Sequence, residues 1–144
     1  MKLRIDNAAL AEEFFEDARL LGIVAPTKPY QFCWHLNQLL GFDFRVNHDL
    51  EIQLTKKTRS YFFSIYEYGV KSGTVRHYLY HNHFDGEYLL PEFKHLDFLW
   101  MIKDEIMPDD EVLTLMNSLR NLPSVQMVVE MTNEQIRNKQ HLIF

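Results

Sequence analysis

The chain has 144 residues, of which 47% are hydrophobic and 14% aromatic, and its 20 acidic and 15 basic side chains give a net charge of −5. This composition excludes an intrinsically disordered chain and supports a sizeable core, so residues 1–144 are predicted to form a single domain. The acidic balance argues against bulk attraction to nucleic acid or anionic lipid, which leaves only a local basic patch for such contacts.

The sequence also bears on disulfide bonds and on membrane-spanning segments. The single cysteine, Cys33, excludes an intramolecular disulfide. The longest apolar runs, LLGIVA and FLWMI, are far shorter than the roughly 18 residues that a membrane-spanning helix needs. The amino-terminal stretch turns acidic without a hydrophobic signal segment. We therefore expect a cytoplasmic protein that makes no membrane contact.

The first forty residues predict a strand, an ambiguous stretch and a helix. Residues 2–6 alternate like a short strand, whereas residues 8–24 favour helix in their first half and a buried strand in their second. A helix follows, with Thr27 as its expected N-cap, Pro29 in its first turn and Gly41 at its end. The side chains expected to face the core are Phe32, Leu36, Leu39 and Leu40.

From Leu50 to about Ile102 the pattern changes to β-structure. The segments LEIQL, RSYFFSIYEY, TVRHYLYHNH and EYLL are rich in β-branched and aromatic residues. Turn signals near Gly73 and at Asp85-Gly86 separate them, which predicts an antiparallel meander. Residues 96–103, LDFLWMIK, predict a further strand that is largely buried.

The last third of the chain predicts a helix, a strand and a short polar helix from about Asn133. The first helix has acidic residues in its first turn and Arg120 near its end, as the helix dipole favours, and Pro123 stops it. The strand follows in residues 124–131. The fold class is therefore α+β: an antiparallel sheet of about five to seven strands with two main helices packed on it, and a C-terminal βαβ-like unit. The apolar stripe of the helix contains Val112, Leu115, Met116 and Leu119.

Aromatic side chains are the first candidates for an interaction surface. Trp34 lies on the side of its helix away from Leu36 and Leu40, roughly 160 to 200° around the helix from Leu36. It is a partner anchor if that face is open, and a core residue if the helix is sandwiched. Basic residues precede one aromatic strand, as in an RNA-binding sheet, but the glycines of such a motif are absent, so nucleic acid is not the expected partner. The tyrosines expected in cross-strand pairs, with hydroxyls reaching solvent or a partner, are Tyr66, Tyr68, Tyr78 and Tyr80.

A second cluster, HNHFDGEY, contains residue types that bind metals. In an extended strand His81, His83, Asp85 and Glu87 would share one face, and imidazole and carboxylate groups suit zinc. Asp85-Gly86 is a turn signal, however, and a turn breaks this alternation. We expect a solvated hairpin tip with no metal and no other cofactor, and His81 and His83 remain only weak metal candidates.

The segment LLPEFKHLDF places two carboxylates in an otherwise apolar run. Pro91 cannot donate a hydrogen bond, so one strand is expected to end at Leu90, before a turn through Glu92. We expect Asp97 to accept a hydrogen bond from the backbone or from a basic side chain and so fix this turn, while Glu92 does likewise or faces solvent. The competing hypothesis is a working site formed by the two carboxylates. The motif residues are Leu90, Pro91, Glu92, Leu96, Asp97 and Phe98.

This motif, LPE followed three residues later by LDF, resembles the IPExxxVDY family of small uncharacterised bacterial proteins. Here leucine, leucine and phenylalanine replace isoleucine, valine and tyrosine, and the last replacement removes a hydroxyl group. The segments LLGI, YQFCWHLN, FSIYEY and LIF also resemble the family, so the likeness runs from about residue 15 to the end. The resemblance implies a bacterial cytoplasmic protein but no particular activity.

The sequence thus supports two functional hypotheses. The leading one is a non-catalytic protein-interaction or regulatory module that binds an unknown protein through its aromatic surface, with a second copy of the chain as one candidate partner. The alternative is a small enzyme or ligand-binding protein with a pocket near Glu92, Asp97 and the nearby histidines.

Overall fold

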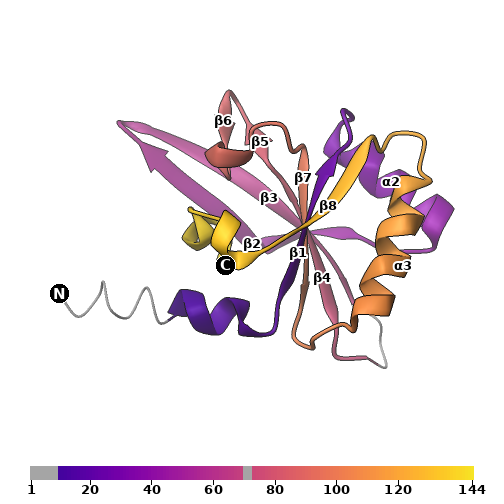
Figure 1. The fold of residues 1–144 in the computed structure, drawn as a ribbon. Helices are drawn as coiled ribbons and strands as arrows, with labels where there is room; N and C mark the ends of the chain where they lie inside the picture. Colours follow the sequence, from indigo (N-terminus) through magenta and orange to yellow (C-terminus); the bar gives the residue numbers. More distant parts are fainter. Residues whose placement is uncertain (1–9, 70–72) are drawn as a thin grey trace.

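A six-stranded antiparallel sheet forms the centre of the molecule (Figure 1). The computed structural model describes residues 10–69 and 73–144. The strand order is β2-β3-β4-β7-β1-β8, and every neighbouring pair is antiparallel. The strands are β1 (Arg19–Val24), β2 (Arg45–Lys56), β3 (Arg59–Gly69), β4 (Arg76–His81), β7 (Phe98–Lys103) and β8 (Met127–Met131), and β5 (His83–Phe84) and β6 (Glu87–Tyr88) form a separate hairpin.

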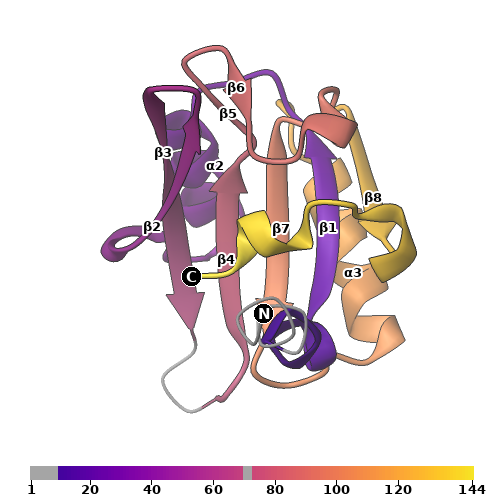
Figure 2. The ribbon, with the colours of Figure 1, turned by 90° about the vertical axis from the view of Figure 1, so that its left-hand side faces the viewer.

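Helical segments cover both faces of this sheet. The helices α2 (Pro29–Leu40) and α3 (Asp109–Arg120) lie on one face (Figure 1). A helix over residues 10–16 and the short 3₁₀ helices η2 (Asn133–Gln135) and η3 (Lys139–Leu142) lie on the other face (Figure 2). The predicted α+β class is therefore confirmed. Within the described ranges, no helix is long and apolar enough to cross a membrane.

The C-terminal half contains the predicted split βαβ unit. The chain runs from β7 through α3 to β8, and β1 lies between these two strands. Because β1 is antiparallel to both neighbours, β7 and β8 run parallel to each other. The helix α3 crosses over the sheet between them, which places its apolar stripe on the face that α2 also covers.

The sheet has a hydrophobic core on each face, and this explains why β7 is a continuous apolar run. All five residues from Phe98 to Ile102 are buried, and their side chains alternate between the two faces. A strand covered on both sides needs no polar positions, so its sequence does not alternate. The helix-side core includes Leu21, Phe32, Leu36, Leu79, Phe98, Trp100, Ile102 and Leu119, and the opposite core includes Phe15, Ile65, Tyr80, Leu89, Leu90, Leu99, Met101 and Leu142.

Two of the three predicted end signals of helix α2 are confirmed, and the third is wrong. Pro29 occupies the first turn, and Gly41 ends the helix at a φ of 74°, where its N–H donates to the Leu36 carbonyl. The expected cap at Thr27 is wrong, because the helix begins after Lys28 and no side chain caps it. The Thr27 hydroxyl instead bonds to Gln31 Oε1 at 3.0 Å.

The expected core face of α2 is also partly wrong. Phe32 and Leu36 are buried and Leu40 is partly buried, but Leu39 is 57% exposed. The helix buries only a narrow stripe, because it lies at the edge of the helix layer with one side open to solvent.

The ambiguous stretch 8–24 contains both predicted elements. Its described part is helical over residues 10–16 and becomes the buried strand β1 at Arg19. The strand predicted over residues 2–6 lies outside the described residues, as do three residues of the turn before Gly73.

The predicted meander is present, with two corrections. Strand β2 begins at Arg45 rather than Leu50, and its register with β3 shifts between Val46 and Glu51, as at a β-bulge. The segment EYLL does not join the main sheet, because only β6 is extended and it pairs with β5. The predicted turn at Asp85-Gly86 is confirmed, since both residues have positive φ, as a tight hairpin requires.

Candidate functional site

Glu92 connects the motif turn to the C-terminal segment. It lies in the 3₁₀ helix η1 (Pro91–Phe93), and its Oε2 accepts backbone hydrogen bonds from Arg137 and Asn138 at 2.7 and 2.9 Å. Its Oε1 accepts a third bond, from Asn138 Nδ2 at 2.7 Å. Partial burial raises the pKa of Glu92, but the hydrogen bonds from Asn138 and Arg137 outweigh it, and the net pKa is lowered. Glu92 is thus an ionised acceptor at neutral pH and not a proton donor.

Asp97 connects the motif to the loop between β1 and α2. Its Oδ2 accepts a hydrogen bond from the backbone N–H of Ala25 at 2.7 Å. Its own N–H donates to the Ile23 carbonyl at 2.8 Å, and its carbonyl accepts from the N–H of Asn82 at 2.9 Å. The side chain therefore holds the loop that leads into α2, and the backbone joins β1 to the end of β4.

Phe98 of the motif faces the helix layer, whereas the two motif leucines lie on the side of the sheet opposite α2 and α3. Leu90 and Leu96 are almost completely buried there. Leu96 lies directly over Gly22 of β1, where an added Cβ atom would be 2.6 Å from Leu96 Cδ1. A side chain at position 22 would push Leu96 aside, so the glycine of the LLGI segment allows this close contact with the motif.

Asn82 organises the motif loop, and sequence patterns did not indicate it. Its side chain is fully buried and accepts from the Leu90 N–H at 2.8 Å. Its Nδ2 donates to the carbonyls of Phe93 at 2.9 Å and Leu96 at 3.0 Å. The only sequence signal was an asparagine, a residue type that strands disfavour, at the end of an aromatic strand.

The two motif carboxylates thus serve separate hydrogen-bond sets. Glu92 holds the C-terminal segment and Asp97 holds the loop before α2, and neither lines the hollows described below. This geometry favours a fastening role over a shared catalytic site, and that role remains a prediction.

Replacing Asp97 with alanine should lower the free energy of unfolding by about 1.5–3 kcal/mol, because the Ala25 N–H loses a charged acceptor. Asp97→Asn retains an oxygen acceptor and should lose less. Urea unfolding at pH 7 measures both values, with Asp49→Ala on the exposed part of β2 as the control. If Asp97→Ala unfolds at the same urea concentration as the wild type, Asp97 does not fasten the fold.

The histidine cluster is a hairpin with its charges already paired. His83 Nε2 accepts from the Gly86 N–H at 3.2 Å, and the rings of His81 and His83 lie 6.2 Å apart. Asp85 pairs with Arg59, and Glu87 pairs with Lys56 at 2.9 Å. Among residues 10–69 and 73–144, no three His, Cys, Asp or Glu side chains are placed to hold a metal ion.

The tyrosines do not form one surface. Tyr66 and Tyr68 face the helix layer, whereas Tyr78 and Tyr80 point into the opposite core. Tyr80 has no exposed surface and donates its hydroxyl hydrogen to the Leu142 carbonyl at 2.7 Å. Each of the four tyrosines lies in a cross-strand pair, as expected, but none pairs with another tyrosine: Tyr66 lies opposite Leu79 and Tyr78 lies opposite Glu67. Tyr78 and Tyr80 are corrected from candidate contacts to core residues.

Two further chemically active side chains are buried in the helix-side core. Nδ1 of His77 accepts from the Trp100 indole N–H at 3.0 Å, and burial lowers the pKa of His77 to about 4. Burial raises the pKa of Cys33 to about 12, so this thiol stays protonated and unreactive at neutral pH. Neither group forms part of an open site.

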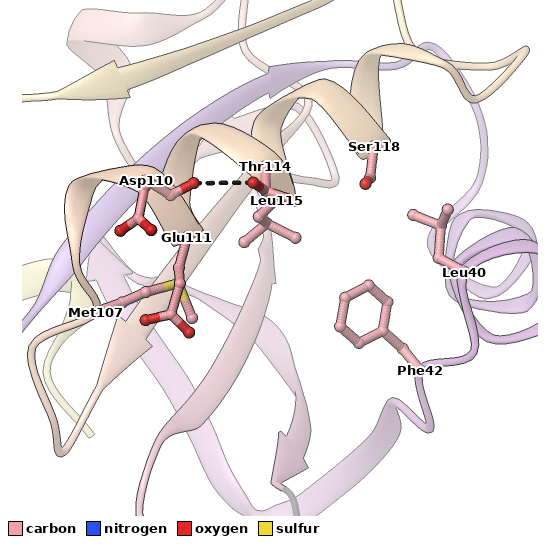
Figure 3. Close-up of a pocket in the computed structure, with 8 residues that line it drawn as sticks. All are labelled: Leu40, Phe42, Met107, Asp110, Glu111, Thr114, Leu115 and Ser118. Carbon is pink, nitrogen blue, oxygen red and sulfur yellow. Dashed lines mark hydrogen bonds between the residues drawn. The ribbon is translucent and has the colours of Figure 1, made fainter.

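A hollow of about 360 Å³ separates the C-terminal end of α2 from α3. Figure 3 shows Leu115 and Ser118 on α3, Leu40 and Phe42 on the α2 side, and Glu111 beside Met107 at one end. The aromatic and aliphatic side chains form the floor, and polar groups of α3 form the rim. We call this hollow the α2–α3 groove, lined by Leu40, Phe42, Met107, Asp110, Glu111, Thr114, Leu115 and Ser118.

The rim of the groove carries free negative charge. Asp109, outside the groove, is paired with Arg19 at 2.7 Å, and Arg19 also binds Glu130 of β8. Asp110 and Glu111 are exposed and form no ion pair with any residue that the structure describes. An apolar floor beside two unpaired carboxylates suits a partner group that is both apolar and cationic.

Trp34 lies on the open side of α2. The side chain is 60% exposed, and Tyr30, one turn earlier on the same helix, is 63% exposed. Of the two alternatives for Trp34, the open helix face is therefore correct. Its use as a partner anchor remains a prediction.

The fold and the groove define an α+β protein with a sheet covered on both faces and a polar-rimmed apolar hollow between its two main helices. Comparison with known proteins adds no further identity: no family model matches the chain, and no curated protein matches it.

Proposed function

We propose that this protein is a non-catalytic interaction module that binds a protein partner through the α2–α3 groove. The observation that carries the proposal is the combination of an apolar floor with the unpaired carboxylates of Asp110 and Glu111. Such a surface recognises a segment that presents an aliphatic or aromatic side chain next to lysine or arginine.

The size of the groove limits what enters it. About 360 Å³ holds one or two side chains but not a whole helix. A stable protein interface buries about 800 Å² on each partner, so the groove is the centre of a larger contact. Trp34, exposed on α2 but outside the groove, is proposed as a separate anchor on the same helix.

The cellular setting is part of the same proposal. The segments that resemble the IPExxxVDY family and the lack of a long apolar run support a bacterial cytoplasmic protein. A non-catalytic role is supported by the separate hydrogen-bond sets of Glu92 and Asp97, which leave neither carboxylate facing a hollow described here.

Peptides selected from a random phage-displayed library should combine an apolar residue with lysine or arginine when wild-type protein is the bait. Thr114→Arg should weaken their binding by about tenfold or more, because it adds bulk and like charge to the groove. Thr114 is an exposed rim residue, so the fold should tolerate this change. Fluorescence anisotropy measures the affinities.

The matched control is Asn117→Arg, which adds the same side chain to an exposed position of α3 outside the groove. It should bind the selected peptides like the wild type. Selected peptides that are acidic, or that bind Thr114→Arg as tightly as Asn117→Arg, would contradict the proposal.

A further inference from the structure

A second hollow, of about 260 Å³, lies on the helix-side face of the sheet near the start of α2. We call it the aromatic pocket and define it by six of its lining residues. They are Glu51, Phe62, Ser64, Tyr66, His81 and Phe84.

The strand register explains how this pocket forms. Glu51 of β2 pairs with Ser64 of β3. One step beyond the paired residues Ile65 and Tyr80, His81 of β4 takes the position opposite Ser64 on its other side. Side chains at directly opposed positions share a face of the sheet, so the small serine has larger neighbours on both sides.

The walls come from residues along β3 and from the β5-β6 hairpin. Phe62 and Tyr66 are two positions before and after Ser64, so they project from the same face. Phe84 adds a further aromatic ring, and Phe62 and Phe84 are each 40% exposed. Ser64, which is itself exposed, thus forms the floor of an open hollow flanked by aromatic rings, Glu51 and His81.

The charges of the pocket have one sign. No lysine or arginine lines it, and the Glu51 carboxylate is exposed and forms no ion pair within the described ranges. Burial lowers the pKa of His81, the neighbouring His83 lowers it further, and Asp97 opposes these effects only in part. His81 is therefore neutral at pH 7, and Glu51 supplies the one formal charge.

We propose that the aromatic pocket binds a small organic cation with a methylated ammonium head group. Aromatic rings attract such a group through their negative faces, and a carboxylate at the rim adds a favourable charge. The volume is below the roughly 300 Å³ of pockets for drug-sized ligands, so it accommodates a head group and a short chain. This proposal is independent of the α2–α3 groove.

The test is an NMR titration of the protein with choline and with 3,3-dimethylbutan-1-ol, its uncharged carbon isostere. Choline should shift the amide signals of Ser64, Tyr66 and Phe84, and should bind about tenfold more tightly than the neutral alcohol because only choline gains the cation–π and carboxylate attraction. Equal affinity for both probes would show a merely apolar hollow and overturn the proposal, as would the absence of shifts with choline.

Two variants test which groups of the pocket attract choline. Glu51→Gln retains the shape of the pocket but removes its charge, and Phe62→Leu removes an exposed ring; each should weaken choline binding severalfold. Asp49→Asn removes a charge from an exposed position of the same strand outside the pocket, and should not change the affinity. A loss of choline affinity in Asp49→Asn equal to that in Glu51→Gln would indicate bulk charge and contradict the proposed site.

Discussion

Replacing Asn82 with alanine should lower the free energy of unfolding by about 3–5 kcal/mol, since each unpaired buried polar group costs about 1–3 kcal/mol. The change leaves the Leu90 N–H and the carbonyls of Phe93 and Leu96 without their side-chain partner. Because these three groups hold the loop between β6 and β7, the leucines of the motif should also lose their fixed positions. Urea unfolding followed by circular dichroism measures the change.

The variants Asn82→Asp and Asn117→Ala test the reason for this loss. Aspartate retains an acceptor for Leu90 but removes both donors and adds a buried charge, so it should also destabilise strongly. Asn117→Ala lies on the exposed side of α3 and should stay within about 0.5 kcal/mol of the wild type. An Asn82→Ala protein as stable as Asn117→Ala would show that the buried hydrogen bonds do not hold the loop.

Acidification from pH 7 to pH 5 should destabilise the protein by about 2 kcal/mol through His77 alone. The pKa of His77 is lowered from 6.5 to about 4 by burial, so the unfolded chain takes up the proton first as the pH falls. Stability is therefore lost between pH 6.5 and pH 4, and this loss levels off below pH 4. Its full size is about 3 kcal/mol.

His77→Gln provides the matching experiment. Glutamine offers an oxygen acceptor to the Trp100 indole N–H but does not titrate, so the variant should lose less stability between pH 7 and pH 5 than the wild type. His48→Gln, on an exposed part of β2, should behave like the wild type. If His77→Gln has the wild-type pH dependence, protonation of His77 is not its source.

Those parts of the fold whose signals are local could be predicted from the sequence. The apolar stripe from Val112 to Leu119 correctly predicted the helix α3, and the continuous apolar run of residues 98–102 correctly predicted the strand β7. The alternating patterns in β3 and β4 predicted strands, but they did not predict on which face of the sheet each side chain lies. Tyr78 and Tyr80 were misplaced for this reason: a C-terminal segment covers their face, and no local pattern indicates that.

The candidate sites depend on contacts between distant segments, so less of them could be predicted from local sequence patterns. The acidic residues of α3 had a sufficient local explanation in the helix dipole, and nothing placed Phe42 beside them. The partner of Asp97 was expected to be a backbone or basic group, but its identity as Ala25 depends on the pairing of β1 with β7. The role of Asn82 could not be predicted because its three side-chain partners come from one irregular loop.

Amide hydrogen exchange of the wild-type protein, with and without a saturating selected peptide, tests whether the partner binds at the α2–α3 groove. We expect slower exchange around the C-terminal end of α2 and along α3, from Leu40 to Phe42 and from Glu111 to Ser118, and unchanged exchange in β2. Protection confined to β2 and the β5-β6 hairpin, with the α2–α3 groove unchanged, would contradict this expectation.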